Sequence, residues 1–337
     1  MKTKSAILVI LTPGFPENEA DSTCLPAQQH IVRAVNRLYP GIKILILSFQ
    51  YPFVQNSYQW HGNTVIAFGG KNRGQLSRFI IWKRVWQQLK TIHKENNIMG
   101  LLSFWCGECA FVAHRYAKKT NAYVKRVGAG GEHYIALSDF IKDSFYHHHG
   151  IRPAHVIPIG IDTAAFGGEL QNKTIDIAAA GSLIPLKQYE IFIRVVAALK
   201  NNLPGIKAVL CGKGPELHKL QTLINDLLLQ HNITLCGERP YHEVLEIMQQ
   251  AKLFLHPSSY EGFGMVCSEA LYAGAQVISF CRPMHAAIPN WHIVENKEEM
   301  IEKATALLQQ LPRPQRILVG AVDATATALV QLFGYRG

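Results

Sequence analysis

The chain has 337 residues, of which 48% are hydrophobic and 17% are charged, and it contains no low-complexity tract. This composition excludes an intrinsically disordered protein and is sufficient for two domains that each bury a core. The net charge of +10 comes from the first half, since residues 1–158 hold 19 Lys and Arg against 8 Asp and Glu, whereas residues 159–337 hold 15 against 16. A basic surface of this kind attracts nucleic acid, an anionic membrane or a phosphorylated substrate.

The apolar runs of the chain are all much shorter than the roughly 20 residues of a membrane-spanning helix. The first run, AILVIL at 6–11, follows two lysines as in a secretory signal, but it ends at Pro13-Gly14 without a cleavage site of small residues. We therefore predict a buried strand there. Seven cysteines, an odd number spread over both halves, favour a reducing compartment over a disulfide framework. We expect a cytoplasmic protein, with peripheral attachment to the inner face of the cell membrane through its basic half.

Short runs rich in Ile, Val and Leu alternate with longer segments of helical period, which is typical of parallel βαβ units. We predict strands at 5–12, 42–49, 98–104 and 133–138, and helices at 24–39, 78–96, 108–120 and 139–151. Pro158 and Gly160 interrupt this rhythm, and the alternation resumes from 174 to 311. The predicted fold class is α/β, with two doubly wound Rossmann-like domains, 1–158 and 159–337, facing each other across a cleft. We expect the last helix to pack back on the first domain.

Two glycine-rich turns follow predicted strands of the second domain. The segment AAAGSLIPLKQ at 178–188 carries Gly181, Ser182 and Lys187, and the segment VLCGKGPE at 209–216 carries Gly212 and Lys213. Glycines let backbone N–H groups approach an anion closely, and a lysine supplies a point charge for phosphate. Together these turns predict a pocket for a diphosphate.

Two carboxylates, Glu261 and Glu269, stand within the otherwise small and apolar segment HPSSYEGFGMVCSEALYAGAQ at 256–276. A helix that begins near Met265 would place Glu269 in its early turns, beside a diphosphate. Acids at that position would repel the phosphates unless they accept hydrogen bonds from sugar hydroxyls. The predicted ligand is therefore a nucleotide sugar, with one acid for each of its two sugars.

The pattern Glu261-x7-Glu269 closely resembles the signature of the large family of retaining GT-B glycosyltransferases, which includes bacterial enzymes of cell-surface glycan synthesis. The segments AAGSLIPLKQYEIFIRV, VLCGKGPE, HVIPIGIDTAAF and HYIALSDFIKDSF resemble other motifs of this family, so the similarity extends over most of the chain. The resemblance implies the GT-B fold and the metal-independent transfer of a hexose, with retention, from a nucleoside-diphosphate sugar to a glycan or lipid-linked acceptor.

The resemblance also implies roles for individual residues. Glu261 and Lys187 would take part in catalysis, together with His133, which is near the position of a site histidine of the family. No covalent protein nucleophile, cofactor or metal is expected. The residues that would bind the donor are Gly14, Gly181, Ser182, Lys187, Gly212, Lys213, Glu261, Gly262, Phe263, Gly264, Met265, Val266 and Glu269.

The sequence departs from the family pattern in three places. Ser182 replaces a common arginine, the segment at 121–138 is abbreviated, and RPMHAAIPNW at 282–291 replaces a Gly-Gly-x-x-Glu motif. We expect these departures to affect the catalytic rate more than donor binding.

Some features of the chain suggest functions other than glycosyl transfer. Cys106 and Cys109 have the Cys-x-x-Cys spacing of thioredoxin sites, but the chain is about three times too long for that fold. Three adjacent histidines at 147–149 point in different directions on a helix and predict no metal site. A sugar-nucleotide epimerase of the same architecture is the enzymatic alternative.

The basic helix at 78–96 carries Phe79, Trp82 and Trp86 at i, i+3 and i+7, a spacing typical of a core or of a membrane-facing surface. No nucleic-acid-binding module is recognisable, so we predict an anionic membrane as the partner of this half and no nucleic acid. The further alternative is a membrane-surface or nucleic-acid-binding protein that keeps the fold without activity.

Overall fold

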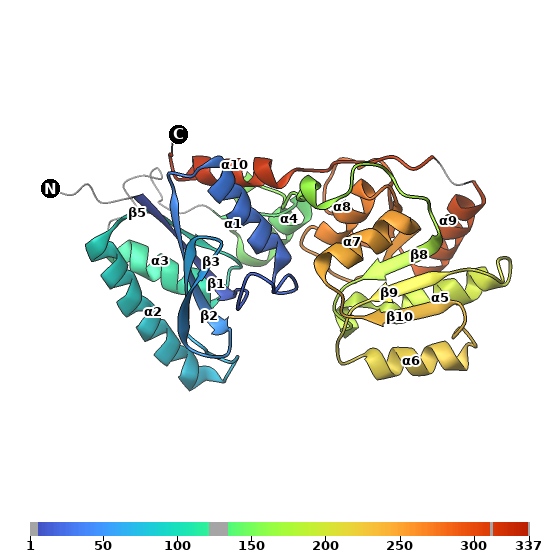
Figure 1. The fold of residues 1–337 in the computed structure, drawn as a ribbon, viewed down its shortest axis with the longest axis horizontal. Coiled ribbons are helices and arrows are strands. Elements are labelled where there is room, and N and C mark those ends of the chain that lie inside the picture. The colour runs from blue at the N-terminus through green and yellow to red at the C-terminus, as the bar shows by residue number, and fades with distance from the viewer. Residues whose placement is uncertain (1–5, 121–133, 311–312, 336–337) are drawn as a thin grey trace. The chain divides into compact units, whose positions relative to one another are not determined.

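The computed structural model describes residues 6–120, 134–310 and 313–335 (Figure 1). The chain divides into two compact units, Met1–Tyr134 with Asp323–Gly337 and Ile135–Val322. This boundary lies earlier than the one predicted between 158 and 159. The reason is that residues 135–158 bond within unit 2, where the Ser138 hydroxyl donates to the Gly262 carbonyl and the Phe140 N–H donates to the Pro283 carbonyl. The last helix belongs to unit 1, where Phe333 packs against Gly100.

Unit 1 contains a five-stranded sheet in the order β3-β4-β2-β1-β5. The strands are β1 (Ala6–Gly14), β2 (Lys43–Tyr51), β3 (Asn56–Trp60), β4 (Asn63–Ala67) and β5 (Asn97–Ser103). All pairs are parallel except the β3–β4 hairpin, which the sequence reading missed. Its two-residue turn, His61-Gly62, has positive φ at both positions, as tight hairpin turns require.

Helices cover both faces of this sheet. They are α1 (Pro26–Leu38), α2 (Gln75–Glu95), α3 (Glu108–Thr120) and α10 (Val322–Leu332). The central strands β1 and β2 are mostly apolar because both of their faces are buried. On one face, Val9 and Leu11 of β1 pack against α2 and α3, including Val85, Leu89 and Val112.

Unit 2 contains a six-stranded parallel sheet in the order β10-β9-β8-β11-β12-β13. The strands are β8 (Ile175–Ala180), β9 (Ala208–Cys211), β10 (Ile233–Gly237), β11 (Ala251–His256), β12 (Gln276–Ser279) and β13 (Trp291–Ile293). After β8, the chain adds β9 and β10 on one side of that strand, and it then adds β11, β12 and β13 on the other side. The point between β8 and β11, where the direction of winding reverses, is where open α/β sheets bind ligands.

The helices of unit 2 form a layer on each face of its sheet. They are α4 (Asp139–His149), α5 (Tyr189–Lys200), α6 (Leu217–Asp226), α7 (Tyr241–Gln250), α8 (Met265–Tyr272) and α9 (Lys297–Gln309), and a short parallel pair, β6 (Ile135–Ala136) and β7 (His155–Val156), precedes the sheet. Apolar side chains of α5, α6 and α9 pack on one face of the sheet, and those of α7 and α8 pack on the other.

Cys211 of β9 and Cys236 of β10 form a disulfide, which the odd number of cysteines did not predict. The other five cysteines are free. Among the residues that the structure describes, no helix is both long and apolar enough to cross a membrane.

Candidate active site

Two of the predicted site residues of unit 2, Lys187 and Glu261, meet where β8 and β11 end side by side. Lys187 lies on a short 3-10 helix (Pro185–Lys187) that follows β8, and Glu261 lies in the loop that follows β11. The two strands are paired in parallel, so their carboxyl ends meet at the same edge of the sheet. The topology therefore brings together two residues that are 74 positions apart in the sequence.

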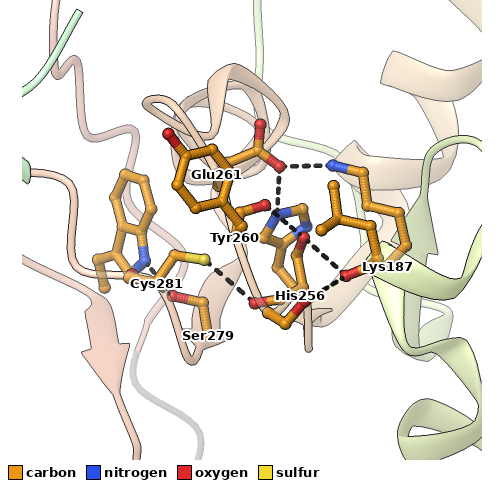
Figure 2. A network of polar contacts seen from close by, with 10 residues as sticks. Lys187, His256, Tyr260, Glu261, Ser279 and Cys281 are labelled. Carbon is orange, nitrogen blue, oxygen red and sulfur yellow. Dashed lines mark hydrogen bonds and ion pairs between the residues drawn. The ribbon is translucent and has the colours of Figure 1, made fainter. Parts of the chain in front are cut away.

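Glu261 is the centre of a group of three polar side chains (Figure 2). One of its carboxylate oxygens lies 2.5 Å from Lys187 Nζ and 3.1 Å from Nε2 of His256, the last residue of β11. His256 is 1% exposed, whereas Lys187 and Glu261 remain partly accessible to solvent. His256 thus contacts Glu261 from the protein interior, and solvent or a ligand can reach Glu261 and Lys187.

The surroundings decide the charges of this group. Burial would raise the pKa of Glu261, but the hydrogen bond from His256 and the positive charge of Lys187 outweigh it and lower the pKa to about 2. Burial lowers the pKa of His256, so a neutral ring donates from Nε2 to the carboxylate. At neutral pH the site therefore presents an ionised carboxylate beside an ammonium group.

The loops that follow β8 and β11 are tied to each other by the carbonyl group of Leu186. It accepts hydrogen bonds from the N–H of Ser259 at 3.0 Å and from the hydroxyl of Ser258 at 3.3 Å. The Ser258 carbonyl accepts in turn from the thiol of Cys281, at 3.1 Å. These bonds hold the backbone on which Lys187 and Glu261 stand.

Helix α8 begins at Met265, as the sequence predicts. Gly264 precedes it with φ of 80°, a left-handed conformation that favours glycine, and Phe263 is buried against Trp291. The N–H groups of Met265 and Val266 belong to the first turn, which has no acceptor within the helix. The start of α8 therefore offers backbone donors and the positive end of a helix dipole directly after Glu261 and Gly262.

Glu269 lies in the second turn of α8 and is 4% exposed. The hydroxyl of Tyr241, the first residue of α7, donates to its carboxylate at 2.8 Å. Burial raises the pKa of Glu269 to about 7, although the hydrogen bond from Tyr241 acts in the opposite direction. Glu269 is therefore a buried acid whose charge is costly in this structure.

The two glycine turns, which we predicted to bind a diphosphate, are bonded and packed within the fold. The N–H of Gly181 donates to the Cys211 carbonyl at 3.0 Å, and the N–H of Gly212 donates to the Gly237 carbonyl at 2.8 Å. A Cβ atom on Gly212 would lie 1.9 Å from the Gly181 carbonyl oxygen. These amides are thus used within the fold, and the glycines allow the two turns to pack closely.

The remaining predicted residues are Gly14, His133, Ser182 and Lys213. Ser182 is exposed, and Lys213 forms an ion pair with Glu238. Gly14 ends β1 in unit 1, and His133 lies outside the described residues.

The alternative motifs show no activated groups. Burial raises the pKa of both Cys106 and Cys109, the reverse of what a reactive redox thiol requires. Within 6–120, 134–310 and 313–335, no three His, Cys, Asp or Glu side chains are arranged to hold a metal ion.

Sequence reasoning did not assign His256 or Tyr241. His256 stands in the quoted segment HPSSYEGFG, five residues before Glu261 at the end of a buried strand, and that position was an available signal. Tyr241 precedes Glu269 by 28 residues on a different helix, and nothing in the local pattern indicates their contact.

Comparisons with known proteins bear on this site. Residues 161–316 match the family model of group 1 glycosyl transferases. The phosphatidylinositol N-acetylglucosaminyltransferase gpi3 subunit of Schizosaccharomyces pombe is 26% identical over 165 residues, which are 48% of this chain and 36% of that protein. The chain thus spans only about a quarter to a third of the length of such curated relatives.

Solved structures of other proteins resemble nearly the whole chain. Sucrose-phosphate synthase from Thermosynechococcus elongatus has a TM-score of 0.73 at 15% identity, with 98% of this chain and 96% of that chain covered. Anabaena HepE in complex with UDP and glucose has a TM-score of 0.63 at 16% identity, with 98% and 95% covered. The chain has the GT-B fold of these structures, as its motifs led us to expect.

Proposed function

We propose that the chain transfers a hexose from a nucleoside-diphosphate sugar to a glycan or lipid-linked acceptor. The match of residues 161–316 to the group 1 glycosyl transferases supports this proposal. The transfer would retain the anomeric configuration and would serve cell-surface polysaccharide synthesis. The observation that carries the proposal is the pairing of Glu261 with Lys187 at the switch point between β8 and β11, directly before the open start of α8.

The phosphates of the donor would lie between the first N–H groups of α8 and the ammonium group of Lys187. Both carry positive charge, and together they would stabilise the negative charge that develops on the departing nucleoside diphosphate. Positive groups of the protein could thus perform the task that a metal ion performs elsewhere, so no metal is part of the proposal.

The two acids would address the two sugars of the donor. Glu261, held ionised by Lys187 and His256, would accept hydrogen bonds from the hydroxyls of the transferred hexose. Glu269 would accept from the ribose hydroxyls. Because Glu269 is buried, a bound ribose would add polar contacts to the hydrogen bond that Tyr241 donates.

The chemical step proposed is attack of the acceptor hydroxyl on the face from which the diphosphate departs. The bond from the anomeric carbon to the phosphate oxygen breaks, and a bond to the acceptor oxygen forms on the same side. The acceptor proton passes to an oxygen of the leaving phosphate. The electrons and charges balance without a covalent protein nucleophile.

Two relatives support the choice of substrates. The solved HepE structure contains UDP and glucose, and the yeast relative is named for transfer of N-acetylglucosamine to phosphatidylinositol. UDP is therefore the first nucleotide to test, and a lipid-linked acceptor fits the basic first half of the chain.

A thermal-shift panel with UDP, GDP, ADP and CDP tests the donor site, with Glu269→Ala as the matched variant. We expect one nucleotide to raise the melting temperature of the wild-type protein and to have no effect on the variant. No shift with any of the four would refute the donor pocket.

The reaction itself requires a second measurement. With the matching donor and an acceptor, the anomeric proton signal of the product should show retained configuration, and a chelator should leave the rate unchanged. Release of an altered free sugar without any acceptor would instead identify an epimerase.

A further inference from the structure

Helix α2 of unit 1 presents apolar side chains to solvent. Leu76, Phe79 and Ile80 are 83%, 60% and 61% exposed, and their spacing of i, i+3 and i+4 places them on one face of the helix. We call these three residues the apolar stripe. The opposite face of α2 carries the residues that are buried in the core, so the apolar stripe is not part of the core of unit 1. Adjacent exposed apolar side chains of this size indicate an interaction surface.

The stripe continues into a groove between α2 and α3. The ring of Phe79 lies 5.1 Å from that of Trp82, which lies 5.0 Å from that of Phe111 on α3. The groove has a volume of about 640 Å³, and the aromatic residues that line it are Trp82, Trp86 and Phe111. The indole N–H of Trp82 donates to Glu108 at 2.9 Å, which holds the ring in place.

Positive side chains line the same groove. We call them the basic rim, and they are Lys83, Arg115, Lys118 and Lys119. Lys83 follows Leu76 by seven residues and thus continues the face of the stripe. The Arg115 guanidinium lies 5.4 Å from the centre of the Phe111 ring, and Lys119 Nζ lies 5.9 Å from that of Trp86. Among the described residues, no carboxylate forms an ion pair with the basic rim.

The combination of charge and apolar side chains selects the class of partner. Nucleic acid or a soluble anionic glycan would use the basic rim and the aromatic rings, but it offers no apolar volume to aliphatic side chains such as Leu76 and Ile80. An anionic bilayer satisfies both features, because apolar side chains enter the acyl region while lysine and arginine remain at the level of the phosphates. Trp82 and Trp86 would lie between these layers, where amphipathic rings are favoured.

We propose that the apolar stripe and the basic rim together form a docking surface for a bilayer of anionic phospholipid, with lipid phosphates held in the groove between α2 and α3. The surface lies entirely within unit 1 and requires no donor. Docking would bring a lipid-linked acceptor to the enzyme, and in this respect the inference extends the proposed function. Membrane binding is nevertheless measurable on its own, so the failure of either proposal leaves the other standing.

The test is sedimentation of the full chain with sucrose-loaded vesicles, either of phosphatidylcholine alone or with added phosphatidylglycerol. We expect binding to the anionic vesicles to be at least about tenfold tighter and to weaken as salt is added. Two double variants separate the two features, Phe79→Ser with Ile80→Ser and Lys118→Glu with Lys119→Glu. Each should weaken the binding to anionic vesicles by about tenfold or more.

Matched controls lie outside the surface. Leu228→Ser replaces a side chain that is 67% exposed in unit 2, and Lys43→Glu reverses an exposed charge at the start of β2, so both should bind as the wild type does. The altered residues are exposed, and a circular dichroism melt of each variant checks that it is folded.

Two outcomes would overturn the proposal. One is equal binding to neutral and anionic vesicles. The other is a combined result. The variant with Phe79→Ser and Ile80→Ser would bind anionic vesicles as the wild type does, and the wild type would bind an oligonucleotide tightly, whereas the variant with Lys118→Glu and Lys119→Glu would not. That result would identify nucleic acid as the partner of the basic rim.

Discussion

Replacing Glu269 with glutamine tests whether this acid is kept for a ligand or for the fold. The change preserves the shape of the side chain and an oxygen that can accept the hydrogen bond from Tyr241, but it removes the titrating group. Burial raises the pKa of Glu269 from 4.5 to about 7. The folded protein therefore binds this proton more tightly than the unfolded chain does, and its stability falls as the pH rises from 4.5 towards 7.

The size of the effect follows from this pKa difference. A rise from 4.5 to about 7 corresponds to a cost of up to about 3 kcal/mol once the carboxyl group is ionised. Glu269→Gln should therefore unfold with nearly the wild-type free energy at pH 4.5 and should be more stable by up to about 3 kcal/mol at about pH 8. Its affinity for the nucleotide should fall by roughly tenfold or more, because a neutral amide replaces a charged acceptor of ribose hydroxyls.

Urea unfolding at several pH values measures the first effect, and titration calorimetry with the matching nucleotide measures the second. Glu246→Gln, an exposed position on α7, serves as the control and should change neither quantity. Destabilisation by Glu269→Gln at both pH values would show that the carboxylate serves the fold. Greater stability with unchanged nucleotide affinity would show that it does not serve the donor.

Three further substitutions test the neighbouring contacts. Lys187→Met should let the pKa of Glu261 rise from about 2 towards 4.5. A lowered pKa stabilises the folded protein above pH 4.5, so urea unfolding at neutral pH should show that the free energy of unfolding falls by about 1 to 3 kcal/mol. An unchanged free energy of unfolding would refute the pairing of Lys187 with Glu261. Gly212→Ala places a Cβ atom 1.9 Å from a carbonyl oxygen and should cost about 2 kcal/mol or more in a thermal melt, whereas Gly62→Ala, which also has positive φ but meets no atom within 4 Å, should cost less. Tyr241→Phe removes the hydrogen bond that lowers the pKa of Glu269, so the pH at which nucleotide binding changes should shift to a higher value. Calorimetry across the pH range measures this shift, and an unchanged pH profile would contradict the prediction.

Local sequence patterns predicted most of the secondary structure. Apolar runs such as AILVIL and IKILILSF are buried on both faces, which is the reason that they are readable as central parallel strands. The β3–β4 hairpin was not predicted because β3 is mostly exposed and its residues, NSYQW, show no apolar run. The structure divides the chain earlier than we predicted. Residues 135–158 have the alternating pattern of the first half, but they bond to residues of the second half that include Gly262, Pro283 and His285.

The sequence by itself determined which residue types stand at the candidate site and where helix α8 begins. The spacing of Glu261 and Glu269, the lysine after β8 and the glycine before Met265 are local features that follow from the chain alone. The tertiary structure decided which of these residues meet, because the pairing of β8 with β11 brings Lys187 to Glu261 across 74 positions. It also decided the charges, since the burial of His256 and Glu269 and the hydroxyl of Tyr241 shift pKa values in ways that depend on neighbours distant in the sequence.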